Sequence, residues 1–154
     1  MSLQLYFNKL VETAILPRKN FSTDAAFDLY YPAFMEDITF LPGERIVVNT
    51  GIACIIPTDY WLKFHERSGL AAKKGIKISG GVIDSSYTGE LKVIMTNTSN
   101  VTQIITGGTA VCQFTIERTE SADLHWVEPA VFEHLVEFKD RKSKGFGSSD
   151  ATTK

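Results

Sequence analysis

Residues able to do chemistry are concentrated in residues 80–90, which read GGVIDSSYTGE. Two consecutive glycines before a β-branched pair are typical of an exposed hairpin whose backbone something must approach closely. Asp84 follows the apolar pair and precedes a polar turn, so we expect a half-buried carboxylate. Such a group can orient a water molecule and take its proton. A hairpin in which Asp84 merely closes an Asx turn accounts equally well for these residues.

A second segment, Arg67-Ser68-Gly69, lies where a predicted strand meets a short predicted helix. Free backbone N–H groups at a helix start, together with a hydroxyl and a guanidinium, can bind an anion such as phosphate. We expect Ser68 to cap this helix and Gly75 to end it. A capped helix with a surface arginine is the alternative explanation.

A third segment places one acidic residue, Asp28, inside the apolar run at residues 25–29. A carboxylate in such a run could be functional. Strand alternation offers an alternative, because it turns every second side chain toward solvent without any functional reason.

The chain changes character from Lys139 onward, where it is basic, rich in Gly and Ser, and nearly free of core residues. We expect this segment to be mobile when nothing is bound. Within it, Gly145-Phe146-Gly147-Ser148-Ser149 offers backbone and hydroxyl donors that could cradle a phosphate. A flexible linker is the alternative, but core packing does not explain an aromatic residue, Phe146, in a polar tail.

Short runs rich in Val, Ile, Thr and aromatic residues predict an all-β sandwich or barrel that positions these segments. The turn Leu41-Pro42-Gly43-Glu44 matches type II, because Pro sets φ and Gly supplies a positive φ. The only helix that the pattern supports follows Arg67. The predicted strands are residues 3–7, 38–41, 45–49, 52–56, 60–65, 76–79, 91–97 and 110–117.

The bulk composition is that of a soluble globular domain, with 154 residues, 44% hydrophobic and 22% charged. A formal charge of -2 argues against a polynucleotide partner but not against a single nucleotide. Cys54 and Cys112 form no metal-binding pair and are expected to be buried free thiols, and the three histidines have no ligand spacing. No signal layout or membrane-length apolar run is present, so we expect no membrane partner and a cytoplasmic or other intracellular location, the host cell if the source is viral.

Taken in order, these segments resemble the five motifs of the trimeric dUTPase (deoxyuridine triphosphate nucleotidohydrolase) family, from about residue 20 to 150. The first three are Ala25-Ala26-Phe27-Asp28-Leu29, Arg67-Ser68-Gly69-Leu70-Ala71, and Gly81-Val82-Ile83-Asp84 through Tyr87, Gly89 and Glu90. The last two are Gly108-Thr109-Ala110-Val111-Cys112-Gln113-Phe114, and Arg141 through Gly145-Phe146-Gly147-Ser148-Ser149.

Several positions depart from the family pattern, and none of them removes a reactive group. The departures are Ala26 for Gly, Glu66 for Pro, Cys112 for Ala, Lys142 for Gly and Ser149 for Thr. Glu66 sets a negative charge beside a phosphate-binding arginine. We expect it to pair with Arg67 when the site is empty.

The resemblance implies a β jelly roll that forms a homotrimer with three sites at subunit interfaces. It implies a β domain at residues 1–138, and a C-terminal arm at 139–154 that closes over a neighbouring subunit's site. The implied reaction is hydrolysis of dUTP to dUMP and pyrophosphate by water attack at the α-phosphorus, with Mg²⁺ as cofactor. It would supply dUMP for thymidylate synthesis and keep uracil out of DNA.

The resemblance also assigns roles to residues. Asp84 would activate the water, and Asp28 would lie near the metal, through water. Substrate would be bound by Arg67, Ser68, Gly69, Gly81, Val82, Ile83, Tyr87, Lys92, Gln113, Arg141, Phe146, Gly147, Ser148 and Ser149. Among these, Tyr87 would exclude a 2′-hydroxyl and Phe146 would stack on the base, while Lys92 is equally well explained as a solvated strand lysine.

Two other functions remain open on the sequence. One is dCTP deaminase, a different enzyme on the same fold, which would need groups that deaminate a cytosine ring. The other is a non-catalytic regulatory binding protein that has kept the fold. The presence of Tyr87, Asp84 and the complete Gly/Ser arm favours the dUTPase over both.

Overall fold

The structure is a computed structural model that describes residues 2–139. The chain divides into two compact units, one through Glu120 and a second beginning at Ser121. The predicted arm begins at residue 139, so that domain boundary stays a prediction.

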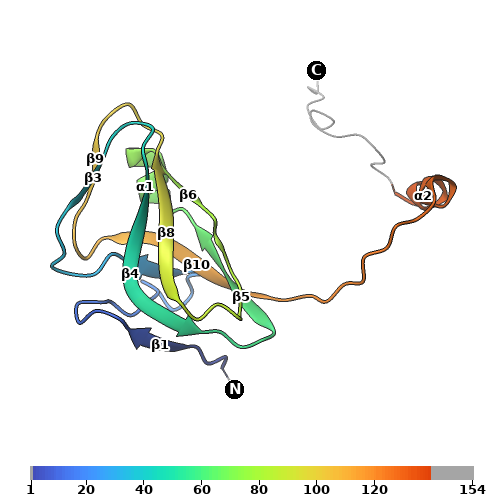
Figure 1. Cartoon of the computed structure of the whole chain (residues 1–154), viewed down its shortest axis with the longest axis horizontal. Helices are drawn as coiled ribbons and strands as arrows, with labels where there is room; N and C mark the ends of the chain where they lie inside the picture. Colours follow the sequence, from blue (N-terminus) through green and yellow to red (C-terminus); the bar gives the residue numbers. More distant parts are fainter. Residues whose placement is uncertain (1, 140–154) are drawn as a thin grey trace. The chain divides into compact units, whose positions relative to one another are not determined.

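The first unit consists of short antiparallel strands in two four-stranded sheets and one two-stranded sheet (Figure 1). Their orders are β1-β4-β8-β6, β2-β10-β5-β7 and β3-β9. The bounds are β1 Tyr6–Lys9, β2 Phe27–Tyr30, β3 Ile38–Phe40, β4 Arg45–Ile55, β5 Tyr60–His65, β6 Ile76–Ser79, β7 Val82–Ile83, β8 Glu90–Asn97, β9 Gln103–Ile105 and β10 Ala110–Arg118. The all-β prediction is confirmed.

Strand alternation builds one hydrophobic core from both large sheets. In β8, Leu91, Val93 and Met95 are buried while Lys92 faces outward. In β10, Phe114 is buried and packs against the ring of Phe27, with 5.5 Å between ring centroids. The alternate residues of β10 therefore lie on the other face of its sheet, outside the hydrophobic core.

Predicted strand bounds hold best where alternation is regular, as in β5 and β6, which match residues 60–65 and 76–79. The two predicted strands at 45–49 and 52–56 are one strand, β4, with a register shift between Asn49 and Ala53. Gly51 has a φ of 69° there, and its N–H donates to the Glu90 carboxylate at 2.9 Å. The Gly51 N–H, which lies at this irregularity, therefore still has a hydrogen-bond acceptor.

The type II turn at residues 41–44 is confirmed, since Gly43 has a φ of 78° and the Glu44 N–H donates to the Leu41 carbonyl at 3.0 Å. Helix α1 covers Ser68–Lys74, and Gly75 ends it with a φ of 61° as predicted. The predicted cap is wrong: Arg67 occupies the N-cap position, and Ser68 is already inside the helix, so no side chain caps it.

The second unit contains a helix that the sequence reading missed, α2 at Pro129–Val136. Pro129 suits the first helical position, because its missing N–H has no partner there in any helix. None of the helix's residues is buried within the described chain. Among residues 2–139, no helix has the length and apolar character needed to cross a bilayer.

Cys54 and Cys112 are buried free thiols, as predicted. Burial raises the pKa of Cys54 to about 11. The pKa of Cys112 is raised further, first by burial and then by the nearby Asp28 carboxylate. Both therefore stay protonated and unreactive near neutral pH.

Candidate active site

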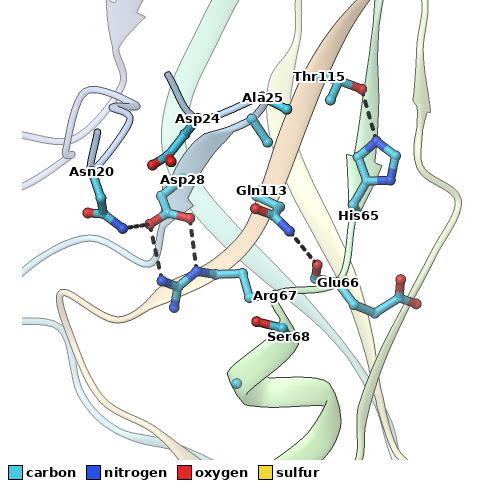
Figure 2. Close-up of a pocket in the computed structure, with 12 residues that line it drawn as sticks. Asn20, Asp24, Ala25, Asp28, His65, Glu66, Arg67, Ser68, Gln113 and Thr115 are labelled. Atoms are coloured by element: carbon cyan, nitrogen blue, oxygen red, sulfur yellow. Dashed lines mark hydrogen bonds and ion pairs between the residues drawn. The ribbon is translucent and has the colours of Figure 1, made fainter. Parts of the chain in front are cut away.

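An open pocket of about 840 Å³ lies where β2, β5 and β10 meet the start of α1 (Figure 2). Its lining is mainly polar and comes from segments far apart in the sequence. Five of the predicted site residues line it together, namely Asp28, Arg67, Ser68, Gly69 and Gln113.

A bidentate ion pair between Arg67 and Asp28 organises the pocket. The Arg67 Nε donates to Asp28 Oδ1 at 2.9 Å, and Nη2 donates to Oδ2 at 3.2 Å. Asn20 adds a third donor to the carboxylate at 3.4 Å, and the Arg67 Nη1 reaches the Ala110 carbonyl at 3.4 Å. Asp28 is only 7% exposed, so the solvent-facing alternative for this residue is wrong.

Arg67→Ala should lower the free energy of unfolding, because it leaves the Asp28 carboxylate buried without its main partner. Breaking a fully buried pair costs about 3–5 kcal/mol. The Arg67 side chain is 32% exposed, which reduces the expected loss to roughly 1–3 kcal/mol. Denaturant unfolding at one fixed protein concentration measures it. Arg67→Lys is the matched control, expected to lose less, and equal stability of Arg67→Ala and the parent chain would contradict the prediction.

Glu66 does not pair with Arg67, which corrects the expectation from the sequence. Its carboxylate accepts the backbone N–H of Ile78 at 3.2 Å, while Arg67 turns to Asp28. The Glu66 carbonyl accepts the side-chain amide of Gln113 at 2.8 Å. The Asp28 carboxylate accepts two hydrogen bonds from the planar guanidinium at once, which suits Arg67 better than a carboxylate on the adjacent residue. Arg67 therefore pairs with Asp28 and not with Glu66.

The pocket includes residues that the sequence reading missed, namely Asn20, Asp24, His65 and Thr115. His65 lies two residues before Arg67, and Thr115 lies two residues after Gln113. Side chains two residues apart in an extended chain point to the same side, so this spacing alone places His65 with Arg67 and Thr115 with Gln113. The His65 Nε2 and Thr115 Oγ1 are 2.9 Å apart, and the Thr115 hydroxyl donates to the Glu117 carboxylate at 2.7 Å. Sequence spacing could have found this pair.

The predicted hairpin residues do not line this pocket in their own chain. Those residues are Gly81, Val82, Ile83, Asp84, Tyr87 and, on the strand that follows, Lys92. Asp84 is exposed in the single chain and not half-buried as expected. Its carbonyl accepts the Tyr87 N–H at 3.1 Å, which closes the tip of the hairpin.

The paired glycines have a reason within the fold. Gly80 has a φ of 64°, and the Gly81 carbonyl accepts the Phe64 N–H at 2.8 Å. A Cβ on Gly81 would lie 2.8 Å from the Phe64 carbonyl oxygen. The close backbone approach expected from the paired glycines is therefore that of β5 in the same chain.

Tyr87 has two contacts within the hairpin although its side chain is exposed. Its hydroxyl donates to the Glu90 carbonyl at 2.8 Å. Its ring lies so close over Gly89 that a Cβ there would come within 2.7 Å of the hydroxyl oxygen. These contacts place the ring beside the hairpin tip.

The remaining predicted site residues lie outside the described residues. They are Arg141, Phe146, Gly147, Ser148 and Ser149.

The residues of the pocket fit a magnesium ion that is held mainly by its ligand. Asp24 and Asp28 carry hard carboxylate oxygens, the donor type that Mg²⁺ prefers. The Asp28 oxygens already accept hydrogen bonds from Arg67 and Asn20, so Asp28 suits a contact with the ion through water. Within residues 2–139, no cluster of His, Cys, Asp or Glu side chains is large enough to form a metal cage of protein groups alone. Mg²⁺ typically keeps waters and phosphate oxygens as ligands, so one or two nearby carboxylates suffice.

The open polar pocket of this β fold is lined by a guanidinium, a hydroxyl and the backbone at the start of α1, groups that can bind phosphate oxygens. The dUTPase family profile matches residues 12–150. The deoxyuridine 5'-triphosphate nucleotidohydrolase of Thermobifida fusca is 39% identical over 139 residues, covering 87% of this chain and 72% of that protein. The Swinepox virus enzyme of the same name is 36% identical and covers 97% and 99%. The chain belongs to the dUTPase family.

Solved structures agree on the fold. A variant of the dUTPase of phage 80alpha has a TM-score of 0.81 at 26% identity, covering 97% of this chain and 100% of that chain. A structure of the Staphylococcus bacteriophage 80alpha dUTPase with dUpNHpp has a TM-score of 0.80 at 26% identity, with coverage of 96% and 99%. A variant from phage phi11 of S. aureus, described with a structural Mg(II) ion, has a TM-score of 0.74 at 25% identity, with coverage of 81% and 97%. The jelly-roll prediction is confirmed.

Proposed function

We propose that this chain hydrolyses dUTP to dUMP and pyrophosphate in sites shared between the subunits of a homotrimer. The observation that carries the proposal is the pocket formed by Asp28, Arg67, Ser68 and Gln113 in a chain whose family match runs from residue 12 to 150. Relatives with the name deoxyuridine 5'-triphosphate nucleotidohydrolase support dUTP as the substrate. A similar solved structure, that of the phage 80alpha dUTPase, contains a dUTP analogue. The buried free thiols suit a reducing intracellular compartment.

The pocket would hold the triphosphate. Arg67, already oriented by Asp28, would contribute charge-assisted hydrogen bonds without reorganising, and Ser68 and Gly69 would add a hydroxyl and backbone amides. Gln113 would lie beside the nucleotide. Asp28 would help to hold a Mg²⁺ ion beside the triphosphate through water, and the ion would supply positive charge there.

The hairpin would supply the water and the base recognition from another subunit. Asp84 would take a proton from a water whose oxygen attacks the α-phosphorus, and the bond to the bridging oxygen would break toward pyrophosphate. Asp84 is exposed and absent from the pocket of its own chain, which fits a role across an interface. Together with the trimer that is typical of the family, this is why we expect the active form to be a homotrimer and not a monomer.

Base and sugar selection would also come from the hairpin. The backbone around Gly81, Val82 and Ile83 would pair with the uracil edge and crowd the 5-methyl of thymine. Tyr87, fixed by Glu90 and Gly89, would close the space beneath C2′. Phe146 would stack on the base, and Arg141, Gly147, Ser148 and Ser149 would contact the phosphates from the arm.

Tyr87→Ala should relax sugar selection, because the opened space beneath C2′ admits a ribose. The rate of UTP hydrolysis relative to dUTP hydrolysis should rise. Parallel pyrophosphate assays with the two nucleotides measure it. Tyr87→Phe is the control, since it keeps the ring and loses only the hydroxyl, and its ratio should stay near that of the parent chain. An unchanged ratio in Tyr87→Ala would place the discrimination in another group.

The deciding experiment is pyrophosphate release from dUTP, with dTTP and UTP as controls and sedimentation to give the oligomeric state. Release from dUTP alone by a trimer supports the proposal. A fully active monomer would contradict the shared site. Ammonia release from dCTP would instead identify a deaminase, and dUTP binding without hydrolysis would identify a regulatory binding protein.

A further inference from the structure

Glu66 joins two segments that have separate tasks in the proposed reaction. It directly precedes Arg67, and its carbonyl accepts the Gln113 side-chain amide at 2.8 Å, so its backbone belongs to the phosphate pocket. Its side chain points to another partner, since the carboxylate accepts the Ile78 N–H at 3.2 Å. Figure 2 shows the carboxylate of Glu66 turned away from Arg67 and Asp28.

Ile78 lies in the stem of the hairpin. It belongs to β6, which runs directly into Gly80 and the hairpin tip, and β6 is the last strand of its sheet. An edge strand has backbone N–H groups without a partner strand on one side. The Glu66 carboxylate occupies the place of such a partner for Ile78.

The other contacts between this part of the chain and the hairpin come from β5, earlier in the sequence. The Phe64 N–H donates to the Gly81 carbonyl at 2.8 Å, and Leu62 and Lys63 pair with β7. β5 ends at His65, just before Glu66. The Glu66 carboxylate therefore extends the connection past the end of the strand, on the hairpin's incoming side.

We propose that Glu66 is a positioning residue for the hairpin that carries Asp84 and the base-recognition backbone, an inference that rests on the proposed function. The part of Glu66 that positions the hairpin is its acceptor oxygen. Its negative charge, which lies beside the pocket for the triphosphate, opposes binding of the nucleotide. The acceptor and the charge can be separated. Glutamine keeps an acceptor oxygen at nearly the same place and removes the charge, whereas alanine removes both.

The test measures kcat and KM for dUTP, and inhibition by dUMP and by inorganic tripolyphosphate, in Glu66→Ala and Glu66→Gln. For Glu66→Ala we expect kcat to fall and dUMP inhibition to weaken, each by about three- to tenfold, the loss typical of one ordinary net hydrogen bond. Inhibition by tripolyphosphate should not weaken, since the phosphate pocket is intact and one repulsive charge is gone. Glu66→Gln should restore kcat and dUMP inhibition to near the parent values.

Glu120→Ala is the matched control, an exposed carboxylate after β10 that should leave every value unchanged. Equal losses in Glu66→Gln and Glu66→Ala would overturn the proposal, because the charge and not the acceptor would then matter. Parent-like kcat and dUMP inhibition in Glu66→Ala would overturn it as well. If Glu66→Ala does not fold, Glu66→Asp, one methylene too short to reach Ile78, takes its place with the same expectations. Failure of the parent chain to release pyrophosphate would instead reject the proposed function.

Discussion

Asp84→Asn is expected to lower turnover of dUTP by at least roughly 10²–10⁴-fold, the loss typical of removing a general base. Asparagine is nearly isosteric with aspartate but cannot accept the proton of the attacking water. The side chain is exposed at the hairpin tip of the single chain. The fold of the chain should therefore be unaffected, and because the two side chains are nearly isosteric, the trimer and its melting temperature should stay unchanged as well.

Nucleotide binding should survive the same substitution, because the phosphate pocket and the uracil-facing backbone stay intact. Single-turnover kinetics together with binding of dUpNHpp would separate the two effects. Asp37→Asn, the same change at an exposed carboxylate just before β3, is the control and should leave turnover unchanged. Near-normal turnover in Asp84→Asn would mean that the base is another group.

The sequence predicted the fold where local pattern decides structure. In β5 and β6, regular alternation placed both strand bounds correctly. It failed for β2, where Asp28 interrupts an apolar run and argues locally against a buried strand. That carboxylate is tolerated inside because Arg67, 39 residues further along, neutralises it with two hydrogen bonds. A local sequence pattern cannot indicate a partner that lies so far away in the chain.

The same limit applies to the site. The residue types at Arg67, Ser68 and Gly69 indicated phosphate chemistry, and the structure places these residues around one pocket. Side-chain partners were harder to predict. Glu66 was expected to pair with its neighbour in sequence, yet an unpaired N–H on the edge of β6 provides a partner that only the sheet order reveals.

One element was missed for a different reason. Helix α2 buries none of its residues within the described chain, so the packing that normally accompanies an amphipathic pattern is absent. Its pattern is short, and Pro129 reads as a breaker unless it is recognised as a first helical residue.

Cutting the chain after Lys139 should abolish most turnover while leaving the trimer folded. The removed segment lies outside the described residues, so the expectation comes from its sequence and from the proposed mechanism. It contains Arg141, Phe146, Ser148 and Ser149, the groups proposed to close over base and phosphates. Such a lid excludes water and completes the charge environment only after substrate binds, so the loss should appear mainly in kcat, with weaker nucleotide binding as a smaller effect.

The melting temperature of the ligand-free protein should barely change, because Phe146 is the only large apolar residue that the cut removes. Turnover and melting temperature of the shortened chain are the two measurements. A chain cut after Asp150 is the matched control, since it loses residues 151–154 and keeps the whole Gly/Ser motif, and it should retain turnover. Unchanged turnover after the longer cut would reject the lid role. A large drop in melting temperature would show that residues 140–154 belong to the folded body, since a lid that closes only over bound substrate contributes nothing to the stability of the empty protein.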